Sequence, residues 1–132
     1  MEWYHYHNME VTPVNPTMKQ LSLRGKTYRA ATSVTELELP HRTALSFVTQ
    51  PHVTKKVLQE AKLAGVRAVW LQPGSFDDND LAYAEANFAI AVGGYEGKSK
   101  NSEGWCVLVD GEKAMAAERM AEATRDQAGK TL

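Results

Sequence analysis

Short apolar runs bounded by polar turns recur along the chain and predict buried strands. The clearest is VRAVWL at residues 66–71, in which only Arg67 interrupts the apolar side chains. A second is TALSFV at residues 43–48. Apolar runs of this length are typical of strands covered on both faces, as in a parallel sheet. Weaker runs predict short strands at residues 11–14, 27–31 and 89–92, with 105–109 as another candidate for the last strand.

Between these runs, apolar residues follow helical spacing. One helix is expected from Pro51 to a glycine stop at Gly65. Its buried stripe is predicted to comprise Val53, Val57, Ala61 and Ala64. The next helix is expected to be capped within residues 75–78, with carboxylates near its positive end and Leu81, Ala84 and Phe88 on its buried side.

The two ends and the early connections complete the pattern. Residues 2–7 fit the last turns of a helix, with Asn8 as a left-handed stop. Residues 18–25 are expected to be a polar connection, followed by a brief helical turn capped at Ser33 or Thr35. Residues 93–104 form a Gly/Ser/Lys loop, and residues 112–128 predict an Ala-rich terminal helix.

Strands that alternate with helices predict an α/β fold. Such βαβ units build a mostly parallel, doubly wound sheet, and right-handed crossovers place helices on both of its faces. With 132 residues, the chain is long enough for one domain and too short for two.

Composition narrows the classes of function. The net charge of −1 argues against broad binding to nucleic acid or to anionic membranes, which requires a basic surplus. No apolar run approaches the roughly 20 residues that span a bilayer. The single cysteine, Cys106, excludes an internal disulfide, and the first ten residues do not resemble a secretory signal. We therefore expect a cytoplasmic protein.

Few residues suggest catalysis or metal binding. His5 and His7 lie two apart, so they would not face each other on a helix, and neither a catalytic set nor a metal site is predicted. Gly97-Lys98-Ser99 lacks the earlier glycine of a P-loop. Cys106 lies in an apolar run typical of a core cysteine. A helix cap is a simpler interpretation of Asp77, Asp78 and Asp80 than a hydrolytic or metal-binding set of carboxylates.

Three polar loops occupy equivalent positions, because each directly follows a predicted strand. In a parallel sheet their positions would line one edge, where ligands bind in open α/β sheets. Each loop pairs hydrogen-bonding groups with a proline. The predicted binding residues are Asn15, Pro16, Thr49, Gln50, Pro51, Gln72, Pro73 and Gly74.

These stretches resemble a family, the small CoA-binding proteins with a Rossmann-like fold, similar to the CoA-binding domain of succinyl-CoA synthetase. The matching segments are VTPVNP (11–16), Gly25-Lys26-x-Tyr28, LSFVTQP (45–51) and above all AVWLQPGS (68–75). Cys106 resembles the cysteine that follows the family's last strand. The resemblance implies CoA as cofactor, with Asn15 and Pro16 near its nucleotide end.

The chain departs from this family at two places. The family opens with a strand and a glycine-containing phosphate loop before the helix with which this sequence begins. The resemblance therefore implies a Rossmann-like domain, residues 1–112, truncated at its N-terminus and lacking the central first strand. Residues 113–132 form a helical tail, and residues 93–104 are an insertion.

Three functions stay open. The first is a CoA-binding module, or one for a related nucleotide cofactor, without evident catalytic machinery. The second is an NAD(P)-binding, oxidoreductase-like domain, although G-x-G-x-x-G is absent. The third is a non-binding fragment that completes its sheet with a partner. A homo-oligomer is also compatible with the sequence.

Overall fold

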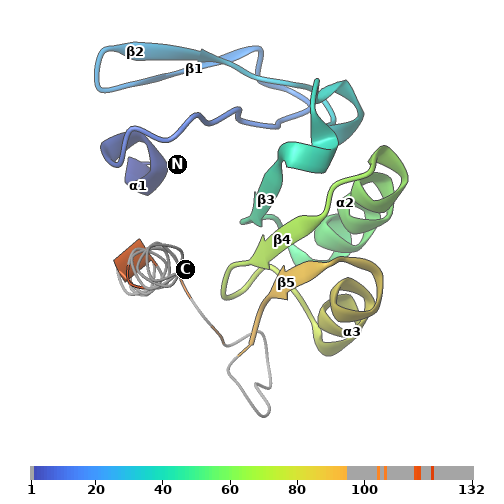
Figure 1. Cartoon of the computed structure of the whole chain (residues 1–132). Coiled ribbons are helices and arrows are strands. Elements are labelled where there is room, and N and C mark those ends of the chain that lie inside the picture. Colours follow the sequence, from blue (N-terminus) through green and yellow to red (C-terminus); the bar gives the residue numbers. More distant parts are fainter. Residues whose placement is uncertain (1, 95–103, 105, 107–114, 117–119, 121–132) are drawn as a thin grey trace, which may run out of the picture.

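A computed structural model describes residues 2–94 together with residues 104, 106, 115, 116 and 120 (Figure 1). In chain order its elements are α1 (Glu2–Tyr6), β1 (Gln20–Leu23), β2 (Lys26–Arg29), η1 (Val34–Glu36), η2 (Pro40–Arg42), β3 (Ala44–Phe47), α2 (Pro51–Ala64), β4 (Ala68–Leu71), α3 (Asp78–Asn87) and β5 (Ile90–Val92). Here η marks a turn of 3-10 helix. Helices and strands alternate from β3 onward, so the fold class is α/β.

The main sheet is parallel and three-stranded, in the order β3-β4-β5. β3 pairs with β4 so that Phe47 lies opposite Leu71, and β4 pairs with β5 so that Val69 lies opposite Ala91. Figure 1 shows α2 and α3 on one face of this sheet and α1 on the other side. The apolar runs therefore predicted these three strands correctly.

Helix α2 begins and ends where the sequence indicates. Pro51 occupies its first turn, and Gly65 ends it with a left-handed φ of 93°. The predicted buried stripe is partly wrong, because the buried residues are Thr54, Leu58 and Ala61, whereas Val53 is exposed. A polar residue can occupy this buried face because the hydroxyl of Thr54 lies 2.6 Å from that of Thr49 and the two share a hydrogen bond.

A hairpin replaces the polar connection predicted at residues 18–25. β1 and β2 are antiparallel, and Leu23 pairs with Lys26. Arg24 and Gly25 between them both have positive φ, at 46° and 81°. Two positive φ values are the signature of a type I′ turn, whose twist matches that of the strands. The Leu-x-Leu alternation before Arg24-Gly25 is the signal that predicts this hairpin.

The strand predicted at residues 11–14 is also wrong. The structure has only an isolated parallel bridge between Val14 and Ala31. The N–H of Ala31 donates to the carbonyl of Pro13 at 2.9 Å, and the N–H of Asn15 donates to the carbonyl of Ala31 at 2.8 Å. Pro13 has no N–H to extend this ladder toward the N-terminus.

Several further local predictions agree with the structure, although Phe88, predicted on the buried side of the helix, follows the end of α3 in extended conformation. Asn8 follows α1 with a left-handed φ of 54°. Ser33 caps η1, and Asp77 caps α3. The predictions for the loop at 93–104, the strand at 105–109 and the terminal helix fall almost entirely outside the described residues. Within the described part of the chain, no helix is long and apolar enough to cross a membrane.

Candidate functional site

The loops that follow β3 and β4 begin side by side. Gln72, the first residue after β4, donates its N–H to the carbonyl of Phe47 at 3.1 Å, which extends the ladder between the two strands. Because the strands are parallel, residues 48–51 and 72–75 leave the sheet at its same edge. The structure thus brings together two of the three loops that the sequence predicts.

Asn15 and Pro16 belong to a different segment, held beside Ala31. The Asn15 side-chain oxygen accepts hydrogen bonds from the N–H groups of Thr17 and Met18, at 2.9 and 3.1 Å. It therefore closes its own turn, as asparagine does in Asx turns. None of the hydrogen bonds of the described residues joins Asn15 to the loops after β3 and β4.

The loop after β4 is a tight, pre-formed turn. Gly74 has a left-handed φ of 87°, a conformation that favours glycine. The buried Ser75 donates both its N–H and its hydroxyl to the carbonyl of Gln72, at 3.0 and 2.7 Å. Pro73 and Gly74 are exposed at the tip. A ligand at this edge would meet a backbone that is already ordered.

The side chain of Gln72 points into the protein. It is buried, and its amide nitrogen donates to the hydroxyl of Ser46 at 3.0 Å. The Ser46 side chain also forms a hydrogen bond with Tyr4 of α1. Burial raises the pKa of the Tyr4 hydroxyl, although this hydrogen bond opposes the rise. Gln72, Ser46 and Tyr4 thus connect β4, β3 and α1.

The sequence did not predict a role for Ser46 or Tyr4. A signal exists for Ser46, because alternation within residues 43–48 places it on the sheet face opposite Leu45 and Phe47. Tyr4 has no comparable signal, since the sequence does not show where α1 lies.

Helices α2 and α3 present opposite electrostatic environments at this edge. Gln50 precedes α2 without a side-chain cap, and no residue of its first turn is acidic. The N-terminus of α2 therefore keeps the partial positive charge that attracts anions. Asp77 caps α3, and Asp78 and Asp80 lie in its first turn, so these carboxylates offset the partial positive charge of this helix N-terminus. A phosphate would be favoured at α2 and repelled at α3.

Asp80 was predicted only as a cap, but it is also deeply buried. It is 1 % exposed, and its Oδ2 accepts from the N–H of Asp77 at 3.1 Å in a capping box. Its Oδ1 has no hydrogen-bond partner among the described residues. Burial raises the pKa of this carboxyl above the ordinary value of 3.8.

A pH-dependent loss of stability follows from Asp80. The folded state holds this proton to a higher pH than the unfolded state, so the free energy of unfolding falls as the pH rises from 3.8 through the raised pKa. We expect Asp80→Asn to abolish this fall and to be more stable than the parent at pH 7, because an amide can still accept from Asp77. Urea unfolding between pH 4 and pH 7 measures it. The exposed Asp78→Asn should keep the parental pH dependence; equal slopes for the parent and Asp80→Asn would contradict the prediction.

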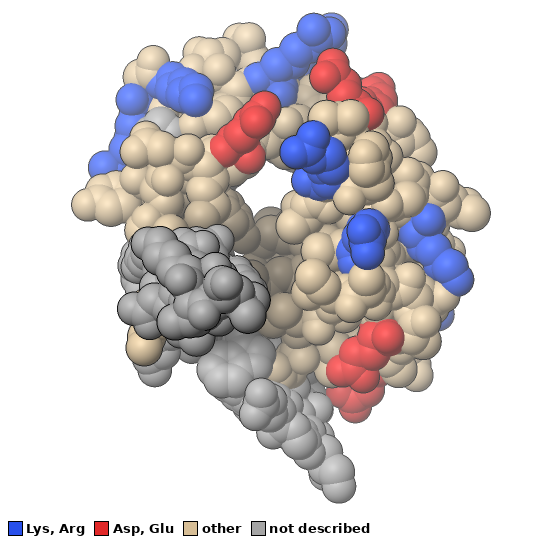
Figure 2. Space-filling view, viewed as in Figure 1, with Lys and Arg blue, Asp and Glu red and all other residues tan. Residues whose placement is uncertain are grey.

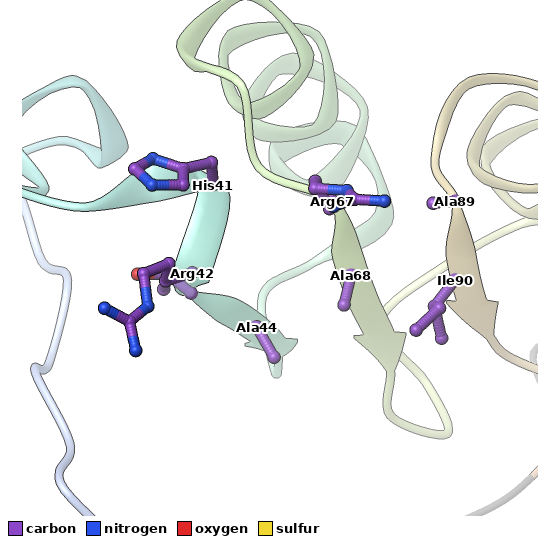
Figure 3. Close-up of a pocket in the computed structure, with 8 residues that line it drawn as sticks. His41, Arg42, Ala44, Arg67, Ala68, Ala89 and Ile90 are labelled. Carbon is purple, nitrogen blue, oxygen red and sulfur yellow. The ribbon is translucent and has the colours of Figure 1, made fainter.

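Two hollows among the described residues lie away from this edge. Figure 3 shows one of about 350 Å³ at the amino ends of β3, β4 and β5, beside His41, Arg42 and Arg67. Its two arginines point apart in this view, so they do not converge on one anion. The other, of about 290 Å³, lies between Asn8–Glu10 and the hairpin residues Lys26 and Tyr28. Neither contains a predicted binding residue.

The strand-end edge offers hydrogen-bonding groups and few ionisable ones. Its side chains are amides, hydroxyls and prolines, which hydrogen-bond and shape a surface. Within the described ranges, no three His, Cys, Asp or Glu residues are close enough to hold a metal ion. Cys106 is half-buried.

Parallel strands, helical crossovers and polar turns at the strand ends define a Rossmann-like α/β fold. The chain belongs to the CoA-binding domain family, whose model, described as "CoA binding domain", matches residues 1–95. This confirms the resemblance carried by residues 11–16 and 68–75.

Two solved structures share the fold. A conserved hypothetical protein from Pyrococcus furiosus is 28% identical, with a TM-score of 0.57, over 68% of this chain and 74% of that one. The crystal structure of Prb, a protein redesigned for binding, is 21% identical, with a TM-score of 0.55, over 69% of this chain and 61% of that one. No curated protein sequence matches the chain.

Proposed function

We propose that the chain is a CoA-binding module and that its ligand lies across the carboxyl ends of β3 and β4. The observation that carries this proposal is the match of residues 1–95 to the CoA-binding domain family. The proposed contacts are those predicted from the sequence: Asn15, Pro16, Thr49, Gln50, Pro51, Gln72, Pro73 and Gly74. Binding without catalysis accords with the amide and hydroxyl groups at this edge.

Electrostatics support one orientation of the ligand. A pyrophosphate would lie at the open N-terminus of α2, where Gln50 and Pro51 begin the helix. The three acidic residues at α3 disfavour it there. The pre-formed turn at Pro73 and Gly74 would then border an uncharged part of the ligand, at little cost in ordering.

Isothermal titration calorimetry with CoA tests the proposal. We expect binding, and we expect Gln72→Ala to weaken it about 5- to 10-fold, the effect of losing one hydrogen bond. Two variants sharpen the result. Gln59→Ala removes an exposed amide from α2 and serves as the control, and Ser46→Ala removes one hydrogen-bond partner of Gln72 while keeping the Gln72 amide.

The pattern across the variants decides the role of Gln72. A loss in Gln72→Ala alone indicates a direct contact with the ligand, and an equal loss in Ser46→Ala indicates that Gln72 acts by ordering the sheet edge. Unchanged affinity in both Gln72→Ala and Ser46→Ala removes Gln72 from the site. Parallel titration with NADPH covers the alternative cofactor; binding of NADPH without CoA would overturn the proposal in favour of an oxidoreductase-like domain.

A further inference from the structure

Thr54 is a buried polar residue beneath the loop that follows β3. It lies on the buried face of α2 and is 0 % exposed. Its N–H donates to the carbonyl of Gln50 at 2.9 Å, and its hydroxyl lies 2.6 Å from the hydroxyl of Thr49. Both partners belong to the loop that the proposed function places against the ligand. Thr54 therefore holds this loop from inside the protein, where no ligand reaches it.

The burial of Thr54 determines which of the two hydroxyls donates. A buried hydroxyl proton needs an acceptor inside the protein, because water cannot replace a hydrogen bond that is not made there. Among the described residues, the acceptors within reach of the Thr54 hydroxyl are the hydroxyl of Thr49 at 2.6 Å and its carbonyl at 3.5 Å. The shorter contact is the stronger one. Thr49 is only half-buried, so its own proton can be donated outward when Thr54 donates to it.

The surroundings of Thr49 offer hydrogen-bond donors rather than charged side chains. Residues 43–54 contain no Asp, Glu, Lys or Arg. Figure 2, viewed as in Figure 1, shows no acidic side chain over the carboxyl ends of β3 and β4 where these are visible. The first turn of α2, which begins at Pro51, adds backbone N–H groups beside the loop. An oxygen atom of a ligand would therefore meet donors here and no like charge.

We infer that Thr54 is a positioning residue that fixes the hydroxyl of Thr49 as a hydrogen-bond donor to an oxygen of the ligand. A hydroxyl that accepts one hydrogen bond is a stronger donor in the next, since the bonds of such a chain polarise one another. In the proposed orientation of CoA this oxygen belongs to the pyrophosphate, so the inference rests on the proposed function. It extends that function to a buried residue that acts on the ligand only through Thr49.

Calorimetry with CoA on single and double variants tests this coupling. Thr49→Val removes the donor and should weaken binding about 10-fold. Thr54→Val keeps most of the buried volume but loses the hydroxyl, and should weaken binding about 5-fold. Because Thr54 acts through Thr49, the double variant should bind no more weakly than Thr49→Val alone. Independent effects would multiply to about 50-fold and would overturn the inference.

The variant Thr54→Ser separates positioning from stability. Serine keeps the hydroxyl but loses a buried methyl group, so this variant should unfold at a lower temperature than the parent and still bind CoA with parental affinity. An equal loss of affinity in Thr54→Ser and Thr54→Val would show that Thr54 acts by packing alone. Either that result or parental affinity in Thr54→Val would overturn the inference.

An NMR measurement on the unliganded chain keeps this inference distinct from the proposed function. Scalar couplings to the methyl group of Thr49 report its side-chain rotamer. We expect one rotamer in the parent and in Thr54→Ser, and averaged rotamers in Thr54→Val, where the partner hydroxyl is gone. The same rotamer in all three chains would overturn the inference whether or not CoA binds. Absence of CoA binding by the parent chain would instead contradict the proposed function.

Discussion

Leu58→Ala is expected to lower the free energy of unfolding by about 2–5 kcal/mol. Leu58 is 0 % exposed, at the centre of the buried face of α2 and within the main core cluster. Truncation removes its apolar contacts and leaves a cavity that a helix packed against α3 and the sheet closes only in part. Urea denaturation followed by far-UV circular dichroism measures the loss.

Leu63 on the same helix provides the matched control. It is 89 % exposed, so Leu63→Ala makes the same chemical change with the same effect on helix propensity. Its effect should stay within about 0.5 kcal/mol. Equal losses for the two variants would show that Leu58 is not buried as the structure has it.

Phe76→Ala is expected to cost about 3–5 kcal/mol and to reduce the affinity for CoA as well. Phe76 is 1 % exposed and directly follows Ser75, the residue that closes the turn on Gln72. The loop therefore depends on one large anchor between β4 and α3. Thermal unfolding gives the change in stability, and calorimetry well below the transition gives the change in binding.

The variant Phe76→Leu separates the loss of core packing from the loss of CoA affinity. Leucine keeps most of the apolar volume, so this variant should lose clearly less stability and retain most of the affinity. Should Phe76→Ala unfold at the parental temperature, the anchoring role would be refuted. Parental affinity in a destabilised Phe76→Ala would instead place the ligand away from this loop.

The strands and helices from β3 onward were predictable because each carries its own local signal. Residues 66–71 form an apolar run interrupted only by Arg67, and residues 43–48 form a largely apolar run. Pro51 and Gly65 mark the two ends of α2. The hairpin was missed because its short strands are half exposed and its turn has arginine at the first position with positive φ. The strand predicted at residues 11–14 does not form because a strand needs a neighbouring strand to pair with. The pattern of a single segment does not show whether that neighbour exists.

The candidate site was predictable only to the level of loops. Parallel pairing of β3 with β4 brings Thr49 and Gln72 to one edge, as alternating strands and helices indicate. The hydrogen bonds from Gln72 to Ser46 and from Ser46 to Tyr4 depend on tertiary placement. Asp80 is similar, since the cap was readable from the sequence but the burial that raises its pKa was not.

The buried core is distributed unevenly along the chain, and Val34 marks the difference. It is the only fully buried member of the main core cluster, among the described residues, that precedes β3, and its turn packs against α2. Among the described residues that precede β3, only Val34 and the partly buried Leu37 belong to or pack against this cluster. In such an arrangement the β1–β2 unit can open and close as a separate cooperative unit, while the helices and the parallel sheet remain folded.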